Sequence, residues 1–171
     1  MCLSTKGEVV LDVWHNNVTK KEFIASKDDN SCGETEELWL HRKGAAPTDQ
    51  GLIVIPGSRG TYSYLVAPVD DQQSLQAAAY SAAHGAGRKW NRSKAYAMSK
   101  NNPNQTPDSL SVTELGSRVI CEDHQLIYEE HPFAYKDIDD VVKDLEAFNV
   151  VKIVAILKPL ITYKTRNVKS K

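Results

Sequence analysis

The chain has 171 residues, of which 41% are hydrophobic and 25% are charged, and its formal net charge is −1. This balance is typical of one globular domain and excludes a disordered chain, and the near-zero charge excludes attraction to nucleic acid by an overall field. Three widely spaced cysteines are a poor disulfide framework and favour a cytoplasmic or nuclear compartment, and no secretory signal or membrane-spanning run of roughly 18 apolar residues is found.

The first predicted strand is the β-branched run at residues 8–13. It leads directly to Trp14, His15 and Asn16. His15 could bind a metal through a neutral ring nitrogen, although a satisfied, half-buried histidine explains the same pattern. A polar, turn-rich loop is expected at residues 27–33, and a second strand at residues 37–41.

A continuous apolar run at residues 52–55 predicts a strand that is buried on both faces. It ends in the turn at residues 56–60, whose backbone amides and Ser58 hydroxyl could bind a phosphate or a sugar, although a plain hairpin turn is the simpler interpretation. Residues 61–66 predict the returning strand, and residues 72–83 predict a helix that leads into His84.

Residues 82–92 carry the strongest local signal in the chain. His84 enters a glycine-rich turn, and Arg88 and Arg92 follow it by four and eight residues. If the chain is helical from about Gly87, both arginines lie on one face, where forked guanidinium groups suit phosphate. The alternative is an ordinary helix start with a solvated basic face.

The remainder of the chain predicts helices at residues 90–100 and 137–148, a hairpin of residues 118–121 with 125–129, and strands within residues 150–163. Residues 103–111 are rich in proline, asparagine and serine and predict a mobile loop. No internal repeat or linker divides the chain. We therefore expect a single α+β domain over residues 1–171, with mixed or antiparallel sheets and helices.

The motifs, in order and spacing, resemble the C-terminal part of the RtcB family of RNA-splicing ligases. The matching segments are Trp14-His15-Asn16, Trp39-Leu40-His41-Arg42-Lys43-Gly44-Ala45, Ile55-Pro56-Gly57-Ser58-Arg59-Gly60, His84-Gly85-Ala86-Gly87-Arg88, Ala134-Tyr135-Lys136-Asp137-Ile138-Asp139 and Lys164. Arg59 stands where a methionine is common in the family. This feature and residues 115–121 look closest to the bacterial RtcB relatives found beside a release-factor-like gene.

The resemblance implies a GTP- and Mn²⁺-dependent ligase that joins an RNA 3′-phosphate, derived from a 2′,3′-cyclic phosphate, to a 5′-hydroxyl, as in tRNA splicing and RNA repair. It makes His84 the nucleophile that forms a histidine–GMP adduct, His15 a manganese ligand, and Arg88 and Arg92 contacts to RNA phosphates. It places the guanylate against His15, Asn16, Pro56, Gly57, Ser58, Arg59, Ser63, His84, Gly85, Ala86, Gly87, Tyr135 and Lys164.

Family members are much longer than this chain, and their N-terminal half supplies most of the metal ligands. The motifs that carry those ligands do not occur among the 171 residues. Since His15 alone cannot hold two manganese ions, the resemblance implies a domain equivalent to the C-terminal half of the RtcB fold that needs a separate N-terminal half as partner. Two alternatives are a non-catalytic remnant that binds guanine nucleotide or RNA ends, and a fragment retained as an interaction module.

Overall fold

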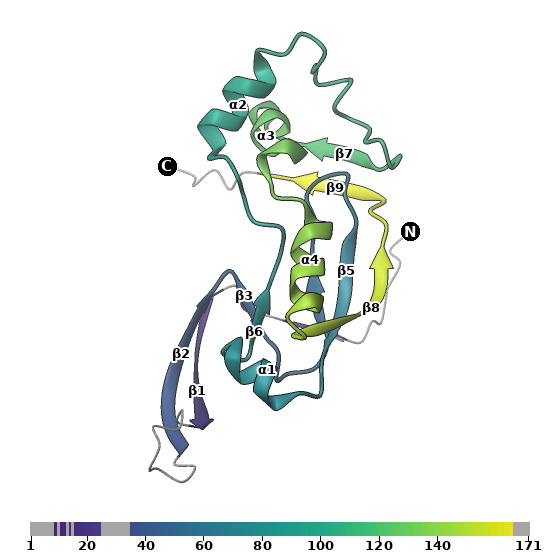
Figure 1. Cartoon of the computed structure of the whole chain (residues 1–171). Coiled ribbons are helices and arrows are strands. Elements are labelled where there is room, and N and C mark those ends of the chain that lie inside the picture. The colour runs from purple at the N-terminus through teal and green to yellow at the C-terminus, as the bar shows by residue number, and fades with distance from the viewer. Residues whose placement is uncertain (1–8, 10, 13, 15, 25–34, 166–171) are drawn as a thin grey trace.

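The computed structural model of the chain describes residues 9, 11–12, 14, 16–24 and 35–165. It confirms the α+β class, with small sheets and helices arranged as Figure 1 shows. The central sheet is antiparallel with strand order β4 (Ile53–Ile55), β5 (Ser63–Pro68) and β8 (Val151–Leu157). These three strands confirm the strands predicted at residues 52–55 and 61–66 and the first of those predicted within residues 150–163.

Helix α4 (Ile138–Ala147) covers this sheet and closes the main core (Figure 1). Asp137 caps its first turn by accepting from the Asp139 backbone N–H at 2.9 Å, as the predicted acidic helix start requires. The Tyr64 hydroxyl donates to Asp139 Oδ1 at 2.7 Å, and this bond, with burial, raises the pKa of Tyr64 to about 12. The largest fully buried apolar side chains are Ile53, Ile55, Val66, Ile138 and Val142.

Strands β1 (Asn16–Ile24) and β2 (Thr35–Lys43) form an antiparallel hairpin that projects from the rest of the molecule (Figure 1). The strand predicted at residues 37–41 is therefore confirmed and extends further in both directions. Positions alternate between exposed and half-buried along β1, so one face of the hairpin lies open. Residues 8, 10 and 13 of the first predicted strand and the loop at 27–33 lie outside the described residues, and residues 9, 11 and 12 carry no regular structure.

The helix predicted over residues 72–83 is wrong in its second half, because α1 (Gln72–Ala77) stops early. Ala79 and Tyr80 adopt φ of 49° and 48°, which ends the helix and turns the chain into β6 (Ser81–Ala83). The Tyr80 ring packs edge-on against Phe23, with ring centroids 5.6 Å apart, and this burial favours the reversal. Strand β6 pairs antiparallel with β3 (Ala45–Pro47) and so delivers His84 from a strand.

The predicted hairpin of residues 118–121 with 125–129 is also wrong. Residues Arg118–Cys121 form β7, but His124–Glu129 form helix α3, which Asp123 caps by accepting from the Gln125 N–H at 2.8 Å. The apolar run of α3 is buried, with Tyr128 edge-on to Tyr96 of α2 (Arg92–Lys100). Strand β7 instead pairs in parallel with β9 (Ile161–Lys164), and a 3₁₀ turn, η1 (Pro132–Ala134), follows α3.

The loop between α2 and β7 is held by local hydrogen bonds, including Leu110 N–H to the Thr106 carbonyl at 3.0 Å. Among the helices described, none is long and apolar enough to cross a membrane.

Candidate functional site

The turn after β4 is held in one conformation by its own hydroxyl groups. The Gly57 N–H donates to Ser63 Oγ at 3.2 Å, and the Thr61 N–H donates to the Ser58 carbonyl at 3.1 Å. A Cβ atom on Gly57 would overlap the Tyr62 carbonyl oxygen, so glycine is required there by close approach of the backbone. The turn is therefore a rigid element at the end of the central sheet.

The turn that begins at His84 packs directly against this element. The Ala86 N–H donates to the Pro56 carbonyl at 3.3 Å, and the His84 N–H donates to the Gly44 carbonyl at 3.4 Å. His84 is half-buried with its Nε2 atom shielded from solvent, about 4.0 Å from where a Cβ on Gly44 would lie. The two glycine-rich turns are thus joined through the backbone, as a shared ligand site requires.

A cavity of about 460 Å³ opens beside the Pro56 turn. It is lined by residues from three distant parts of the chain, namely Pro56, Gly57, Ser58, Arg59, Thr61, Ser63, Glu130, Tyr135, Pro159, Ile161, Thr162, Tyr163 and Lys164. All predicted guanylate contacts from Pro56 to Ser63, together with Tyr135 and Lys164, therefore share one cavity. Residues His84–Gly87 adjoin it through Pro56 but do not line it.

The predicted N-terminal contacts stand apart from this cavity. Asn16 lies on the β1–β2 hairpin, where its Oδ1 contacts Nε2 of His41 at 2.7 Å. His15 lies outside the described residues. Within the part of the chain that the structure describes, no group of three or more His, Cys, Asp or Glu side chains could hold a metal ion.

Arg88 and Arg92 do not lie on one helix, because α2 begins only at Arg92. Arg88 instead forms a β-bridge with Tyr135, and its guanidinium group is used internally. Nη1 donates to Glu130 Oε1 at 3.2 Å and to the Tyr135 hydroxyl at 2.9 Å, Nη2 to the Glu129 carbonyl at 2.7 Å, and Nε to the Trp90 carbonyl at 3.0 Å. Arg92 also contacts Glu130 Oε1, through Nε at 3.2 Å, but its side chain is 68% exposed.

This contrast predicts different effects for the two arginines. Arg88→Ala should lower the free energy of unfolding by roughly 2 kcal/mol, because it leaves the Trp90 and Glu129 carbonyls without their Arg88 donor and removes one of several donors to the buried Glu130 carboxylate. Arg92→Ala should cost less than about 0.5 kcal/mol, as expected for an exposed charge. Urea unfolding of both variants measures the difference. Equal losses would show that Arg88 is not held as described.

Glu130 is a buried, charged residue of the candidate site that sequence reasoning missed. It is 5% exposed and lies at the C-terminal end of α3, where it contacts Arg88, Arg92, Tyr135 and, at 4.0 Å, Lys164. Burial alone would raise the pKa of Glu130. Hydrogen bonds from Tyr135 and Arg92 and the charges of Arg88 and Lys164 outweigh burial and lower the pKa. The one sequence feature that could have pointed to Glu130 is its position four residues before the Ala134-Tyr135 motif.

Arg59 is buried at the base of the cavity, where Nη1 donates to the Ile127 carbonyl at 2.9 Å. Burial lowers the pKa of Arg59, and the charges of Cys121, Glu130 and Tyr135 act against this shift. Arg59 also borders a second cavity of about 340 Å³, which His131 and Thr113 help to line. Arg59 therefore lines both cavities.

The burial of His131 should make the stability of the fold depend on pH. Burial, with a smaller effect of the Arg59 charge, lowers the pKa of His131 from 6.5 to about 4. The unfolded chain takes up a proton near pH 6.5 while the folded chain does not, so stability falls as the pH falls below 6.5. Between pH 6.5 and 5, the free energy of unfolding of the His131→Asn variant should fall by about 1.5 kcal/mol less than that of the unaltered chain. Asparagine can still cap the 3₁₀ turn, so the variant should fold.

Urea unfolding at several pH values tests this, with His124→Gln at the exposed start of α3 as the matched control. An unchanged slope in His131→Asn would contradict it.

Comparisons with known proteins give a consistent match. A family model described as "tRNA-splicing ligase RtcB" matches residues 3–165. The chain is 47% identical over 158 residues to the RNA-splicing ligase RtcB2 of Escherichia coli, covering 92% of this chain and 38% of the relative. It is 33% identical over 172 residues to the tRNA-splicing ligase RtcB of Nanoarchaeum equitans, covering 92% and 33%. The chain thus spans about a third of the length of the curated relatives that it matches.

Proposed function

The chain belongs to the RtcB family, and from that premise we propose that it forms the guanylate-binding and nucleophile-bearing part of an RNA ligase. The observation that carries the proposal is the cavity beside the Pro56 turn. It gathers Pro56–Ser63 contacts, Tyr135 and Lys164, and it adjoins the His84 turn through the Ala86–Pro56 hydrogen bond. Cationic groups and backbone turns of this kind suit a nucleotide phosphate.

In the proposed reaction, a neutral ring nitrogen of His84 attacks the α-phosphorus of GTP. The N–P bond forms as the bond to the β-phosphate oxygen breaks, and pyrophosphate leaves. The guanylyl group then passes to an RNA 3′-phosphate. A 5′-hydroxyl displaces GMP and completes the phosphodiester bond. The rigid turns at Gly57 and Gly85 contribute by positioning, which supplies much of the rate in phosphoryl transfer.

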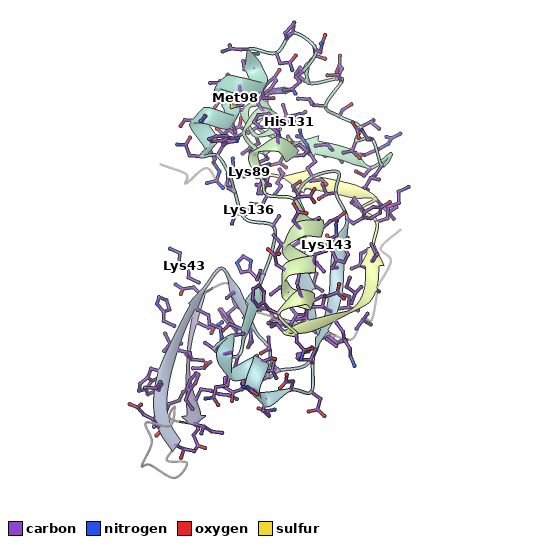
Figure 2. All side chains as sticks on the ribbon, viewed as in Figure 1. Lys43, Lys89, Met98, His131, Lys136 and Lys143 are labelled. Carbon is purple, nitrogen blue, oxygen red and sulfur yellow. The ribbon has the colours of Figure 1, made fainter. Side chains whose placement is uncertain are left out.

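Exposed lysines surround the His84 turn and favour an RNA backbone as the second ligand. Lys43 precedes Gly44, whose carbonyl accepts from His84, and the Lys136 N–H donates to the Gly87 carbonyl at 3.0 Å. Figure 2 shows Lys43, Lys89 and Lys136 on the same side of the molecule, extending into the space between the β1–β2 hairpin and α2. These three lysines give this side a local positive charge that the overall net charge conceals.

The described residues do not fit a pair of manganese ions, since they include no cluster of suitable ligands and manganese prefers several nitrogen or oxygen donors. The proposed metal ligands would come from the part of the family polypeptide that this chain does not span. Large apolar side chains exposed on the hairpin, on β8 and β9 and in the turn between these two strands support such a partner segment. They include Val18, Trp39, Val154, Ile156, Leu160 and Ile161.

Intact mass after incubation with GTP and Mn²⁺ tests the proposal. The isolated chain should gain little or no guanylyl mass, and the chain supplied with the preceding part of Escherichia coli RtcB2 should gain one group per molecule. Efficient labelling of the isolated chain would show that the metal ligands are already present. Binding of GTP without any adduct, even with the added part, would favour the non-catalytic remnant, and absence of binding would favour the interaction module.

A further inference from the structure

We propose that the cavity between Arg59 and His131 binds a small tetrahedral oxyanion, either inorganic phosphate or the terminal phosphate of a larger molecule. This Arg59–His131 cavity has a volume of about 340 Å³ and lies between the turn after β4, the loop before β7 and the start of η1. It shares Arg59 and Thr61 with the proposed guanylate cavity but none of the other described residues that line that cavity. An anion bound there is therefore a ligand beyond the proposed function.

Arg59 is a buried cation whose hydrogen-bonding capacity is largely unused. It is 6% exposed, and Nη1 donates to the Ile127 carbonyl at 2.9 Å. A guanidinium group carries five N–H donors, and among the described residues no other acceptor contacts it. The charge of Glu130 acts on Arg59, but no described carboxylate forms an ion pair with it. Because a buried charge without a paired counter-charge destabilises the fold, an anion in the adjoining cavity would stabilise it.

His131 presents a second donor to the same cavity. Nδ1 accepts from the Phe133 backbone N–H at 3.3 Å, so the proton of the neutral ring is on Nε2. Burial, with a smaller effect of the Arg59 charge, lowers the pKa of His131 to about 4 and keeps the ring neutral near pH 7. The effect of Arg59 on His131 indicates that the two side chains lie close together. Among the described residues no acceptor contacts Nε2, so this N–H is available to a ligand.

The hydroxyl groups that line the cavity are already bonded within the protein. Thr61 Oγ1 donates to the Ser58 carbonyl at 2.9 Å, and Thr113 Oγ1 lies 2.6 Å from Ser117 Oγ. Ser109 Oγ donates to backbone carbonyls of its own loop. With one exception at the rim, the side-chain groups left for a ligand are therefore the guanidinium and imidazole donors. The ligand must bring the acceptors, as the oxygens of phosphate and sulfate do, and forked guanidinium donors match such oxygens.

Glu114 is that exception, because its exposed carboxylate also lines the cavity. It repels an anion, but water and salt screen an exposed charge. Glu114→Gln should therefore strengthen anion binding by about twofold. The volume of about 340 Å³ is roughly ten times the ~30 Å³ that one water molecule occupies in the liquid, so a phosphate group that carries a substituent also fits.

A sulfate titration followed by NMR of the His131 ring tests the site in the unaltered chain. Sulfate keeps both negative charges between pH 5 and 7, so any pH dependence of its binding arises from the protein. A bound dianion stabilises the imidazolium form. Sulfate should therefore raise the pKa of His131 above about 4, and sulfate affinity should increase as the pH falls from 7 to 5. Sodium chloride at matched ionic strength is the control, and a pKa of His131 that is the same in both salts would overturn the inference.

His131→Asn identifies the ring signal and removes the second donor, while asparagine can still cap η1. The sulfate affinity of this variant should be lower than that of the unaltered chain by roughly threefold at pH 5, and it should not depend on pH. A pH dependence that persists in His131→Asn would come from another residue and would contradict the proposed role of His131.

Arg59→Met should weaken sulfate binding by roughly tenfold or more, because it removes the charge and the forked donors from the cavity. The matched control is Arg118→Met, which removes an exposed arginine from β7 and should bind sulfate as the unaltered chain does. Arg59→Lys keeps the charge and a donor for the Ile127 carbonyl, so it should remain folded and lose about threefold in affinity. Equal affinities in all three variants would mean that sulfate binds elsewhere, and the proposal would fail.

Lys164→Met separates this site from the proposed guanylate cavity. Lys164 lines that cavity but not the Arg59–His131 cavity, so the variant should weaken GTP binding and leave the response of His131 to sulfate unchanged. Loss of the response would place the anion in the guanylate cavity and refute this inference alone. A chain that binds sulfate beside His131 but does not bind GTP would contradict the proposed function alone.

Two ligands with the same phosphate chemistry identify the source of the anion. Inorganic phosphate and a dinucleotide with a 3′-phosphate are each titrated against sulfate at His131, with the unphosphorylated dinucleotide as control. Tighter binding of the phosphorylated dinucleotide would identify a nucleic-acid end as the ligand, whereas equal or tighter binding of inorganic phosphate would identify the free ion. If neither displaces sulfate, the cavity is not a phosphate site.

Discussion

His84→Ala is expected to abolish the guanylyl adduct completely in a chain fused to the preceding part of Escherichia coli RtcB2. The variant lacks the ring nitrogen that is proposed to bond to phosphorus, so the guanylyl group of GTP cannot be transferred to it. The fold should persist, because the backbone contacts of this turn, from His84 to Gly44 and from Ala86 to Pro56, do not involve the imidazole. Mass spectrometry after incubation with GTP and Mn²⁺ measures the outcome.

The control is His124→Ala, which removes an exposed imidazole from the start of α3 and should label as the unaltered fusion does. Retained labelling in His84→Ala would place the nucleophile elsewhere. Loss of labelling in both variants would point to damage unrelated to the nucleophile.

Gly57→Ala should have the largest effect on the fold among single methyl additions near the cavity. The new Cβ would overlap the Tyr62 carbonyl oxygen and Thr61 Oγ1, and the first of these is backbone at the approach to β5. Because that backbone must move, we expect a loss of roughly 3 kcal/mol in the free energy of unfolding. GTP binding should also be lost, since the displaced turn lines the cavity. Urea unfolding and nucleotide titration give the two measurements.

Gly85→Ala is the matched control, because neither glycine has a positive φ and alanine can adopt both backbone conformations. Its Cβ would lie 3.3 Å from the Pro56 carbonyl oxygen, a tight contact that a small shift relieves. We expect a loss of less than about 1 kcal/mol. Similar losses in the two variants would mean that close approach at Gly57 is not what holds the turn.

The central sheet and α4 could be predicted from sequence because hydrophobic pattern and caps agree there. The β4 run is apolar throughout, and Asp137 precedes a helical stripe that includes Ile138 and Val142. Helix α3 could not be predicted, because residues 125–129 suit a strand as well as a helix, and only burial against α2 decides. The early end of α1 depends in the same way on a tertiary contact, that of Tyr80 with Phe23.

The candidate site shows the same division. Glycine-rich turns carry a local signal, and that signal is enough to find the motifs at Pro56 and His84. Arg88 shows what sequence spacing misses: its place four residues after His84 predicts a helix face, but pairing with Tyr135 across the chain turns the guanidinium inward. Glu130 has little signal of its own, because its role arises only where α3, the segment after His84 and β9 meet.

The parallel pairing of β9 with β7 has a consequence for the local stability of the cavity wall. Among the described residues this sheet has two strands, and the side chains of Ile161 and Tyr163 in β9 are 62% and 54% exposed. Segments with few buried contacts open at a low free-energy cost. We therefore expect β9 to open before the central sheet in native-state hydrogen exchange. A ligand that bridges the Pro56 turn and Lys164 would slow that opening, so hydrogen exchange in β9 should become slower as more of the cavity is filled by ligand.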